Sequence, residues 1–316
     1  MRPTVSVIIP TLNQAAYLEQ AVQSILRVKA AVSSEADIEI IVVDDGCTDA
    51  TPEVMSRYPV VFVRNESKGI PQGRNTGLRT ASGEFIAFLD HDDAWLDGHI
   101  SEHLDALQSH PDAAVAYTQG YLADANLRPV YGPCPSASLP SGDLFIWSLS
   151  NTIQLGAMVV RKEAIDAVGG FDESLMTTDD TDLQLKLAAR FDFIGINRTT
   201  VLWRQYPRNH PRYEYWDQSW RQGEKMLLRD ARLAARRRPS TWQVLAARFK
   251  RRGWVAANVV TMADQCLVEH RPREASRFLL GALRVSPLHA SLRVPGFWVT
   301  SFALACQLVE AGVQLV

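Results

Sequence analysis

Three carboxylates stand together in the stretch Glu84-Phe-Ile-Ala-Phe-Leu-Asp-His-Asp-Asp93, where Asp90, Asp92 and Asp93 follow an apolar run. That run, Phe85–Leu89, is typical of a strand buried on both faces. Acidic residues form strands poorly and are costly to bury unpaired, so we expect them just past a strand's carboxyl end, where open α/β sheets bind ligands. Residues two apart in extended chain point the same way. Asp90 and Asp92 can therefore converge on one hard divalent cation, Mg²⁺ or Mn²⁺.

The same acidic cluster has a simpler interpretation. Acids after a strand often form a solvated turn that leads into a helix, and a helix is expected here over Asp97–His110. Asp-x-Asp is also a short and common pattern. The choice between a metal site and a turn therefore depends on the elements around the cluster.

Strands and helices alternate in the first half of the chain. The pattern predicts strands at Val5–Ile9, Ile38–Val43, Val60–Val63 and Phe85–Leu89, and helices over Ala15–Leu26 and from Ile70 onward. Such alternation predicts a mostly parallel α/β sheet with helices on both faces. Right-handed crossovers bring the loops after the strands to one edge. The side chains expected at this edge are Thr11, Asp44, Asp45, Arg74 and the acids of residues 90–93.

These edge residues can form a nucleotide site. A carboxylate at Asp44 or Asp45 can accept a hydrogen bond from a base imide or a ribose hydroxyl, and Arg74 can pair with phosphate. A cation on Asp92 can bridge a diphosphate. The two standard phosphate cradles are absent from the sequence. No G-x-G-x-x-G follows the first strand, and no G-x-x-x-x-G-K-[ST] occurs.

Four motifs, in this order and spacing, resemble those of the family 2 glycosyltransferases, which have the GT-A fold. They are Val5-Ser-Val-Ile-Ile-Pro-Thr-Leu-Asn13, Val43-Asp-Asp-Gly-Cys-Thr-Asp49, Gly73-Arg-Asn-Thr-Gly77 and Phe88-Leu-Asp-His-Asp-Asp93. The resemblance covers roughly residues 4–210, and Cys47 stands where the family usually has serine. The family implies a nucleotide-sugar donor, most often UDP-linked, a divalent metal on the Asp-x-Asp, and inversion at the anomeric carbon.

The resemblance also implies roles for single residues. It implies that Asp92 binds the metal with support from Asp90, and that His210 is a third ligand, although a histidine near prolines is alternatively a surface residue. It implies that Arg204 and Arg208 neutralise the departing nucleotide. The residues implied to bind the donor nucleotide are Pro10, Thr11, Asn13, Asp44, Asp45, Arg74, Asp90 and His91.

The segment Thr177-Thr-Asp-Asp-Thr-Asp182 resembles the one that supplies the catalytic base in the family, and it precedes a helix predicted at Leu183–Arg190. An inverting displacement needs one carboxylate to take the proton of the acceptor hydroxyl. We predict Asp180 as this base, with Asp179 as the alternative. The competing interpretation is purely structural, because a helix N-terminus prefers the same residues for capping and for its dipole.

The whole chain has the composition of an ordinary globular protein, with 316 residues and a formal net charge of −2. Its four cysteines are scattered and form no CxxC. This pattern argues against a disulfide framework or a zinc ligand set, and favours a reducing, cytoplasmic setting. The N-terminus enters a strand without a signal-peptide pattern. No run of eighteen apolar residues predicts a membrane-spanning helix.

The pattern becomes helical from residue 213, which predicts a GT-A domain at 1–212 and an α-helical region at 213–316. The expected helices are Trp216–Arg237, Thr241–Arg251, Asn258–Val268 and Glu274–Leu283. The apolar segment Ser291–Val316 is either a core helix or an interfacial anchor at an anionic membrane, assisted by Arg236–Arg238 and Lys250–Arg252. No nucleic-acid-reading module accompanies these basic residues, so no nucleic-acid partner is expected.

Together these features predict a metal-dependent, inverting glycosyltransferase. It would move a sugar from a nucleotide-sugar, most often a UDP-sugar, to a saccharide or lipid-linked acceptor in cell-surface polysaccharide assembly. Two alternatives stay open. A sugar-phosphate nucleotidyltransferase has a similar fold but usually carries a Gly-rich basic loop after the first strand, which Pro10-Thr-Leu-Asn-Gln14 is not. A catalytically silent module would bind the sugar nucleotide without turning it over.

Overall fold

The computed structural model describes residues 2–175, 177–205, 216–230 and 239–286, which fall into two compact units. The first unit holds residues 2–148 and 152–205. The second holds residues 149–151, 216–230 and 239–286. The predicted domain boundary at 212/213 lies outside the described residues. So do Arg236–Arg238 and Ser291–Val316, which were predicted to contribute to a membrane anchor.

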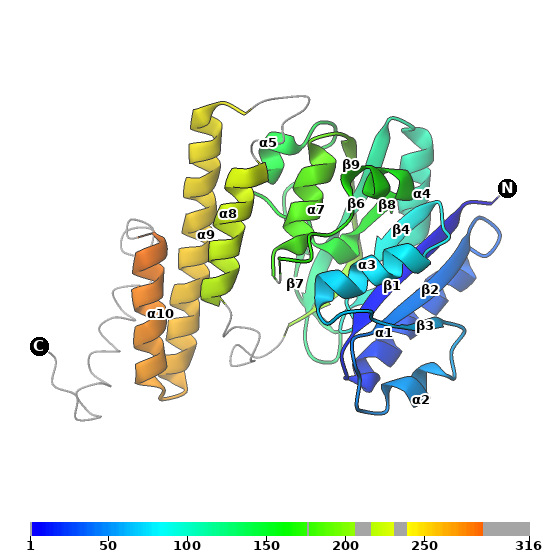
Figure 1. Ribbon diagram of the computed structural model, residues 1–316, viewed down its shortest axis with the longest axis horizontal. Helices are drawn as coiled ribbons and strands as arrows, with labels where there is room; N and C mark the ends of the chain where they lie inside the picture. The colour runs from blue at the N-terminus through cyan, green and yellow to red at the C-terminus, as the bar shows by residue number, and fades with distance from the viewer. Residues whose placement is uncertain (1, 176, 206–215, 231–238, 287–316) are drawn as a thin grey trace, which may run out of the picture. The chain divides into compact units, whose positions relative to one another are not determined.

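Nine strands of the described chain form one mixed sheet in the first unit (Figure 1). They are β1 Thr4–Thr11, β2 Asp37–Asp44, β3 Val61–Arg64, β4 Phe85–Phe88, β5 Ala94–Trp95, β6 Ala113–Ala123, β7 Pro129–Cys134, β8 Met158–Arg161 and β9 Asp192–Arg204. The strand order is β3-β2-β1-β4-β8-β6-β9-β5, with β7 added beside β6. The first four strands pair in parallel as predicted, and β8 runs antiparallel between β4 and β6.

Helices cover both faces of this sheet, as the alternating pattern predicts. They are α1 Ala15–Ala31, α2 Thr51–Met55, α3 Ile70–Thr80, α4 His99–Ser109, α5 Phe145–Ser148, α6 Lys162–Val168 and α7 Asp179–Ala188, with a 3₁₀ helix, η1, at Leu155–Ala157. Val7 and Ile9 of β1 join the buried cluster that includes α1 and α4. The intervening Ile8 points to the other face, because strand side chains alternate. There α3 approaches so closely that a Cβ on Gly77 would lie 2.3 Å from Ile8 Cγ2.

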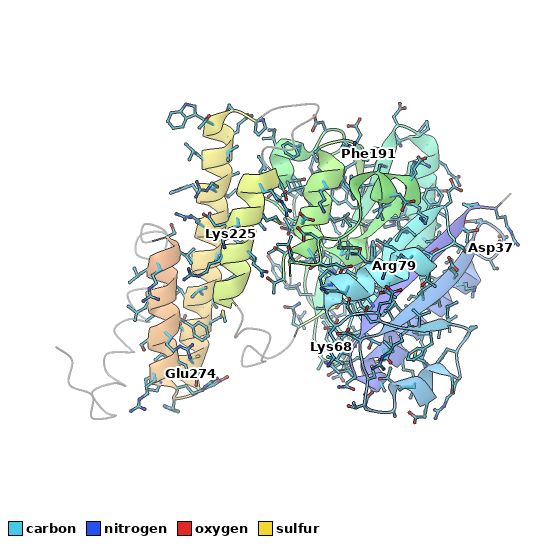
Figure 2. The ribbon with its side chains drawn as sticks, in the orientation of Figure 1. Asp37, Lys68, Arg79, Phe191, Lys225 and Glu274 are labelled. Carbon is cyan, nitrogen blue, oxygen red and sulfur yellow. The ribbon has the colours of Figure 1, made fainter. Side chains whose placement is uncertain are left out.

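The register of the parallel strands sets which residues share the carboxyl edge of the sheet. Thr11 pairs with Asp44, and Asp44 with Arg64, so three strands end side by side. Ile8 pairs with Phe88, so the acids after β4 emerge at the same edge. Asp37 begins β2 at the opposite end of the strand, and Lys68 lies in the connection that follows β3 (Figure 2).

The second unit contains three helices, α8 Trp216–Asp230, α9 Thr241–Val268 and α10 Pro272–Val285. The prediction of separate helices at Thr241–Arg251 and Asn258–Val268 is wrong, because α9 continues through the buried Gly253. A single glycine inside a helix costs only about 1 kcal/mol, which packing can offset. The predicted hairpin is present, and α10 packs on the second half of α9 through a shared apolar cluster. None of the helices in the described part of the chain is both long and apolar enough to cross a bilayer.

Candidate active site

The acids after β4 form a tight cluster at the carboxyl edge. Asp90, Asp92 and Asp93 offer carboxylate oxygens that lie within 4.8 Å of one another. The backbone N–H of Asp93 donates to the Asp90 carbonyl at 3.1 Å, so a turn folds the acids back toward one point. Among the described residues, none donates a hydrogen bond to the Asp92 carboxylate. Clustered carboxylate oxygens are the hard ligands that Mg²⁺ and Mn²⁺ prefer, so these residues fit the predicted metal.

Arg204, the last residue of β9, holds the backbone of this acidic loop. Its Nε donates to the Asp92 carbonyl at 2.7 Å, and its own N–H donates to the Asp93 carboxylate at 2.8 Å. The guanidinium also donates to Gln20 on α1 and stacks on the Tyr17 ring, with 4.2 Å between Cζ and the centroid. Arg204 is buried. It therefore fixes the loop from behind, and its engaged position does not support the predicted role of neutralising a departing nucleotide.

A second buried arginine connects the metal cluster to the predicted base segment. Arg74, on α3, pairs with Asp90 at 2.9 Å through Nη2 and with Asp179 at 2.5 Å through Nη1. Burial lowers the pKa of Arg74, but the Asp179 and Asp90 carboxylates outweigh it and raise the pKa, so the guanidinium stays cationic. Pairing of Arg74 with phosphate stays a prediction, because carboxylates hold the two terminal nitrogens here. Arg74 therefore links the acidic loop after β4 to the start of α7, two segments that are far apart in the sequence.

The two candidate bases lie in the first turn of α7, which begins four residues earlier than predicted. Asp179 is buried and paired with Arg74. Asp180 is partly exposed, and its Oδ1 accepts from the Thr181 N–H at 2.6 Å. Burial and the Asp179 carboxylate raise the pKa of Asp180 to about 6, against the opposing effect of Arg74. Of the two, Asp180 has the environment of a proton acceptor.

The loops after β1 and β2, both predicted to bind the nucleotide, are hydrogen-bonded to each other. The Asn13 side chain accepts from the Thr48 N–H at 2.8 Å, and the Asn13 N–H donates to Cys47 Sγ at 3.0 Å. Asp49 accepts from the Ala15 N–H at the start of α1. Asn13 and its neighbour Gln14 adopt left-handed backbone conformations, with φ of 61° and 64°. Asparagine tolerates this region better than most residues, which helps the loop turn into α1.

Asp44 and Asp45, the predicted base readers, are already engaged inside the protein. Asp44 accepts from the Cys47 N–H at 2.6 Å and pairs with Arg64 at 2.7 Å. Burial pushes the pKa of Asp44 up, but these partners outweigh it and hold the pKa below its usual range. Asp45 accepts from the Asn65 side chain at 2.6 Å and from Gly69 N–H at 3.0 Å. Both acids shape the loop, and recognition of a base by either one stays a prediction.

Five further predicted residues have mixed outcomes. Thr11 is buried and its hydroxyl donates to the Asn13 carbonyl at 3.2 Å, while Pro10 lies one residue earlier in β1. His91 Nε2 is buried without a hydrogen-bond partner in the part of the chain that the structure describes. His210 and the nearby Arg208 lie outside the described residues.

Sequence reasoning missed the partners that organise these motifs. Arg64, which binds Asp44, and Asn65, which binds Asp45, follow one another at the end of β3. Thr76 on α3 also donates to the Asn65 side-chain oxygen at 3.0 Å. The one sequence signal for Arg64 is its position. It is a basic residue at the end of a short predicted strand, and other predicted strands end in acids.

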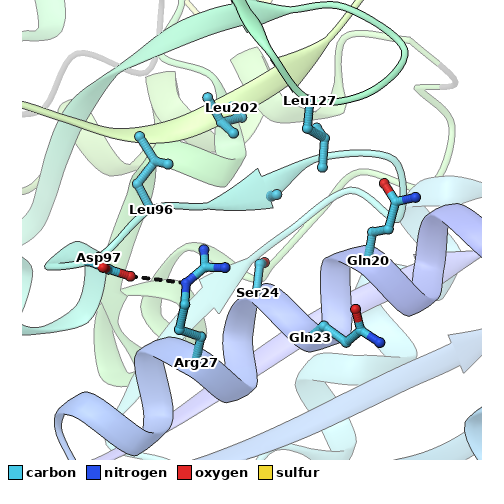
Figure 3. A pocket seen from close by; sticks show the side chains of 9 residues that line it. Gln20, Gln23, Ser24, Arg27, Leu96, Asp97, Leu127 and Leu202 are labelled. Atoms are coloured by element: carbon cyan, nitrogen blue, oxygen red, sulfur yellow. Dashed lines mark hydrogen bonds and ion pairs between the residues drawn. The ribbon is translucent and has the colours of Figure 1, made fainter.

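A separate open pocket of about 690 Å³ lies between α1 and β5 (Figure 3). Arg27 points across it and pairs with Asp97 at 3.0 Å. Gln20, Ser24 and Leu127 also line it. None of the predicted site residues belongs to its lining, so it is distinct from the acidic edge.

Comparison with solved structures supports the fold. The crystal structure of Staphylococcus aureus TarS 1–349 matches with a TM-score of 0.62 at 17% identity, over 100% of this chain and 93% of that one. The mannosyltransferase PcManGT of Pyrobaculum calidifontis, in complex with GDP-Man and Mn²⁺, matches with a TM-score of 0.57 at 18% identity, over 99% and 87%. At these identities the likeness shows the GT-A fold alone.

Sequence comparison identifies the family. An uncharacterized glycosyltransferase of Rickettsia prowazekii is 30% identical over 190 residues, and the match spans 58% of each chain. TuaG of Bacillus subtilis, whose name assigns it to teichuronic acid biosynthesis, is 33% identical over 126 residues, or 38% of this chain and 47% of TuaG. The chain thus spans about half to three-fifths of these relatives. The model of glycosyl transferase family 2 matches residues 6–166, half of the chain, and the chain belongs to this family.

Proposed function

We propose that this protein is a metal-dependent, inverting glycosyltransferase that transfers a sugar from a nucleotide-sugar to a hydroxyl of a saccharide or lipid-linked acceptor. The observation that carries the proposal is the joined acidic edge. Asp90, Asp92 and Asp93 offer a cation site, and Arg74 connects that site to the acids of α7. A metal-assisted displacement needs a cation for the diphosphate and a base for the acceptor, and this edge offers residues for both.

The metal would be Mn²⁺ or Mg²⁺, held by Asp92 with support from Asp90 and Asp93. When bound, such a cation neutralises negative charge that develops on a departing diphosphate. His210 is retained as a proposed third ligand on the motif resemblance alone. Arg204 would keep the loop in place through the Asp92 carbonyl and the Asp93 carboxylate, so that the acids do not have to reorganise when the cation arrives.

Asp180 would act as the base that accepts the acceptor hydroxyl proton. A base works best when its pKa lies close to the working pH, and a pKa of about 6 is a better match than that of an ordinary aspartate. Asp179 is less suited, because its carboxylate is already paired with Arg74. In this scheme Asp179 and Arg74 orient the start of α7 and set the electrostatics around Asp180.

The donor would be a UDP-sugar, bound along the loops after β1 and β2. Solved relatives of the same fold contain UDP, UDP-GlcNAc or GDP-Man. TuaG suggests a role in the synthesis of a cell-surface polysaccharide. We further propose a GT-A domain at residues 1–212, an α-helical region at 213–316, and a cytoplasmic enzyme that works at the inner face of the membrane.

Donor hydrolysis tests this proposal. The purified chain is incubated with UDP-, GDP- and dTDP-sugars, in Mn²⁺ or in EDTA, and free nucleotide is measured. We expect slow, Mn²⁺-dependent release from one donor. Asp92→Asn should abolish the release, whereas the matched Asp97→Asn, an exposed acid just beyond the loop, should retain it. Pyrophosphate release from UTP and a sugar phosphate would instead favour a nucleotidyltransferase. A donor that is neither bound nor released would contradict the proposed site.

A further inference from the structure

The first half of α9 exposes large apolar side chains. Trp242 is 80% exposed, Leu245 43%, Phe249 42% and Trp254 69%. Monomeric proteins seldom expose two tryptophans, a phenylalanine and a leucine within four turns of one helix. This concentration differs from the second half of the same helix, where apolar residues are mostly buried.

Helical periodicity places three of these residues together. Trp242, Leu245 and Phe249 follow the spacing i, i+3, i+7, which puts them on one side of the helix. Lys250, eight residues after Trp242, borders this side and is exposed, whereas Trp254, nine residues after Leu245, lies on the opposite side of the helix from Leu245. We call Trp242, Leu245, Phe249 and Lys250 the α9 face.

Described neighbours cover other parts of α9. The apolar cluster shared with α10 begins at Ala256 and runs to Leu267, so it lies beyond the α9 face (Figure 1). The contact with α8 runs through Glu224, which pairs with Arg248 at 3.0 Å and with Arg252 at 3.1 Å. The α9 face therefore precedes the cluster shared with α10 along the helix, and its side chains are exposed beside the contact with α8.

Charge indicates what this face would meet. Residues 231–263 contain eight Lys/Arg and no Asp/Glu. Within α9, Arg248 and Arg252 both pair with Glu224. The Lys250 ammonium donates to the neutral side chain of Asn151 at 3.0 Å and keeps its charge. An apolar face that carries a lysine, in a stretch of sequence without acids, is complementary to an anionic surface that has an apolar layer beneath it.

We propose that the α9 face docks on an anionic lipid membrane, with α9 parallel to the surface and the aromatic side chains of this face in the headgroup layer. Indole rings favour this layer because they are apolar with one polar N–H. A second copy of the chain fits less well, because two such faces would bring their cations together. The inference does not rest on the transfer reaction, since docking needs neither donor nor metal. It would hold the enzyme where a lipid-linked acceptor is presented.

Vesicle sedimentation tests the docking. The full chain is mixed with phosphatidylcholine vesicles, or with vesicles of phosphatidylcholine and anionic phosphatidylglycerol, and the bound fraction is measured. We expect binding to the anionic vesicles only, and weaker binding as salt rises. The double variant Trp242→Ser with Phe249→Ser should lower the partition coefficient by about tenfold or more, because apolar burial is lost. Lys250→Glu should lower it on the order of tenfold.

Matched controls locate the effect. Leu280 is 56% exposed on α10, outside the α9 face, so Leu280→Ser should bind as the wild type does. All variants change exposed residues, and unchanged circular dichroism and melting temperature should verify their fold. Tryptophan quenching by vesicles with brominated acyl chains should decrease in Trp242→Phe.

Three outcomes would overturn the docking proposal. The first is equal binding to neutral and anionic vesicles, or to neither. The second is wild-type binding by the double variant, which would move the contact elsewhere, for example to residues 287–316. The third is a wild-type dimer that becomes monomeric in the double variant while vesicle binding is absent, which would assign the face to a second copy.

Discussion

Acids stand at the carboxyl ends of β2 and β4 at the same edge of the sheet, but Asp92 has surroundings unlike those of Asp44 and Asp49. After β2, Asp44 and Asp49 accept hydrogen bonds from backbone N–H groups, and Asp44 also pairs with Arg64. Burial raises the pKa of each of these two carboxyls, yet their hydrogen bonds outweigh it and lower the pKa. After β4, the Asp92 carboxylate has no such donor among the described residues, and the three acids share one point.

The difference lies in where the backbone N–H groups point. Gly46, with φ of 109°, lets the chain after β2 turn its N–H groups onto Asp44. The loop after β4 instead presents the Asp92 carbonyl to Arg204, so the side chain is left for another partner. Identical residue types at equivalent positions can thus be structural in one loop and free for chemistry in the next.

The largest expected effect separates these two loops. Asp92→Asn should lower donor turnover on the order of a thousandfold. Without the Asp92 carboxylate the cation is held poorly, and the departing diphosphate loses several kcal/mol of stabilisation. It should leave the melting temperature unchanged. Asp44→Asn should lower the free energy of unfolding by about 1–3 kcal/mol, because a buried charge-assisted network is lost.

Calorimetry and turnover, measured on both variants, check this contrast. The lowered pKa of Asp44 also sets the pH window. Its stabilisation is present above the unfolded pKa and disappears as pH falls through the lower folded value, so the two melting curves should converge in acid. The comparison fails if Asp92→Asn is as destabilised as Asp44→Asn.

The start of α7 gives the next effect. Asp180→Asn should lower kcat by roughly 10²–10⁴, the usual contribution of a base, with little change in donor KM. In the wild type, the rate should fall as pH drops through about 6, since protonated Asp180 cannot accept a proton. Asp179 and Arg74 are the charged groups facing it. A pH profile that is flat from 5 to 8 (roughly the range in which this carboxyl titrates) would remove Asp180 as the base.

The Asp180→Asn variant, which should lose activity, should at the same time gain stability. The folded pKa of Asp180 lies above its unfolded value, so ionising it at neutral pH costs folding energy. Asp180→Asn removes this cost and should raise the melting temperature at neutral pH. The gain should shrink as pH falls below the folded pKa toward the unfolded one, because the wild-type carboxyl is then increasingly protonated in the folded state. A lowered melting temperature at neutral pH would contradict the assignment.

Arg204 predicts a smaller and more selective effect. Arg204→Lys keeps the charge but loses the fork that holds the Asp92 carbonyl and Gln20 together. The Mn²⁺ concentration for half-maximal activity should rise about 10–100-fold, as for other residues that orient metal ligands, with much of kcat recovered at high Mn²⁺. Arg27→Lys, at an exposed arginine on α1, is the control and should not shift the metal titration. Loss of kcat without a metal shift would point to a general packing defect.

Much of the fold of the first unit can be predicted from the sequence, because each strand or helix is indicated by a short local pattern. The β-branched runs and the acids that follow them correctly predict the parallel strands and their shared edge. Gly73 and Gly77, which were singled out only as part of a motif, lie where α3 meets the sheet. The antiparallel part of the sheet was not predicted. β8 and β5 are only four and two residues long, too short to show a clear alternation of apolar and polar residues.

The partners within the site are less legible because they depend on tertiary contacts. Arg74 and Asp179 are 105 residues apart, and Arg204 and Asp92 are 112 apart, so no local pattern pairs them. An exposed arginine beside a phosphate and a buried arginine between carboxylates look alike in sequence. Only the fold distinguishes them.

The smallest effect concerns Cys47, where motifs of this kind usually carry serine. Its Sγ lies 3.0 Å from the Asn13 N–H, a distance that an oxygen acceptor prefers. Burial and the adjacent Asp44 raise the pKa of Cys47 to about 11, so fewer than roughly one thiol in a thousand is ionised near neutral pH. Cys47→Ser should therefore change stability by no more than about 0.5 kcal/mol and turnover by no more than about twofold.

Alkylation by iodoacetamide, followed by peptide mass mapping, should modify Cys47 slowly in the folded chain and rapidly after denaturation. A fast reaction in the folded state, accompanied by loss of turnover, would show that the loop after β2 opens. The hydrogen bonds of Asp44 and Asn13 would then be present in only one conformation of the loop after β2. In that case the contrast between the two acidic loops would be one of dynamics as well as of charge.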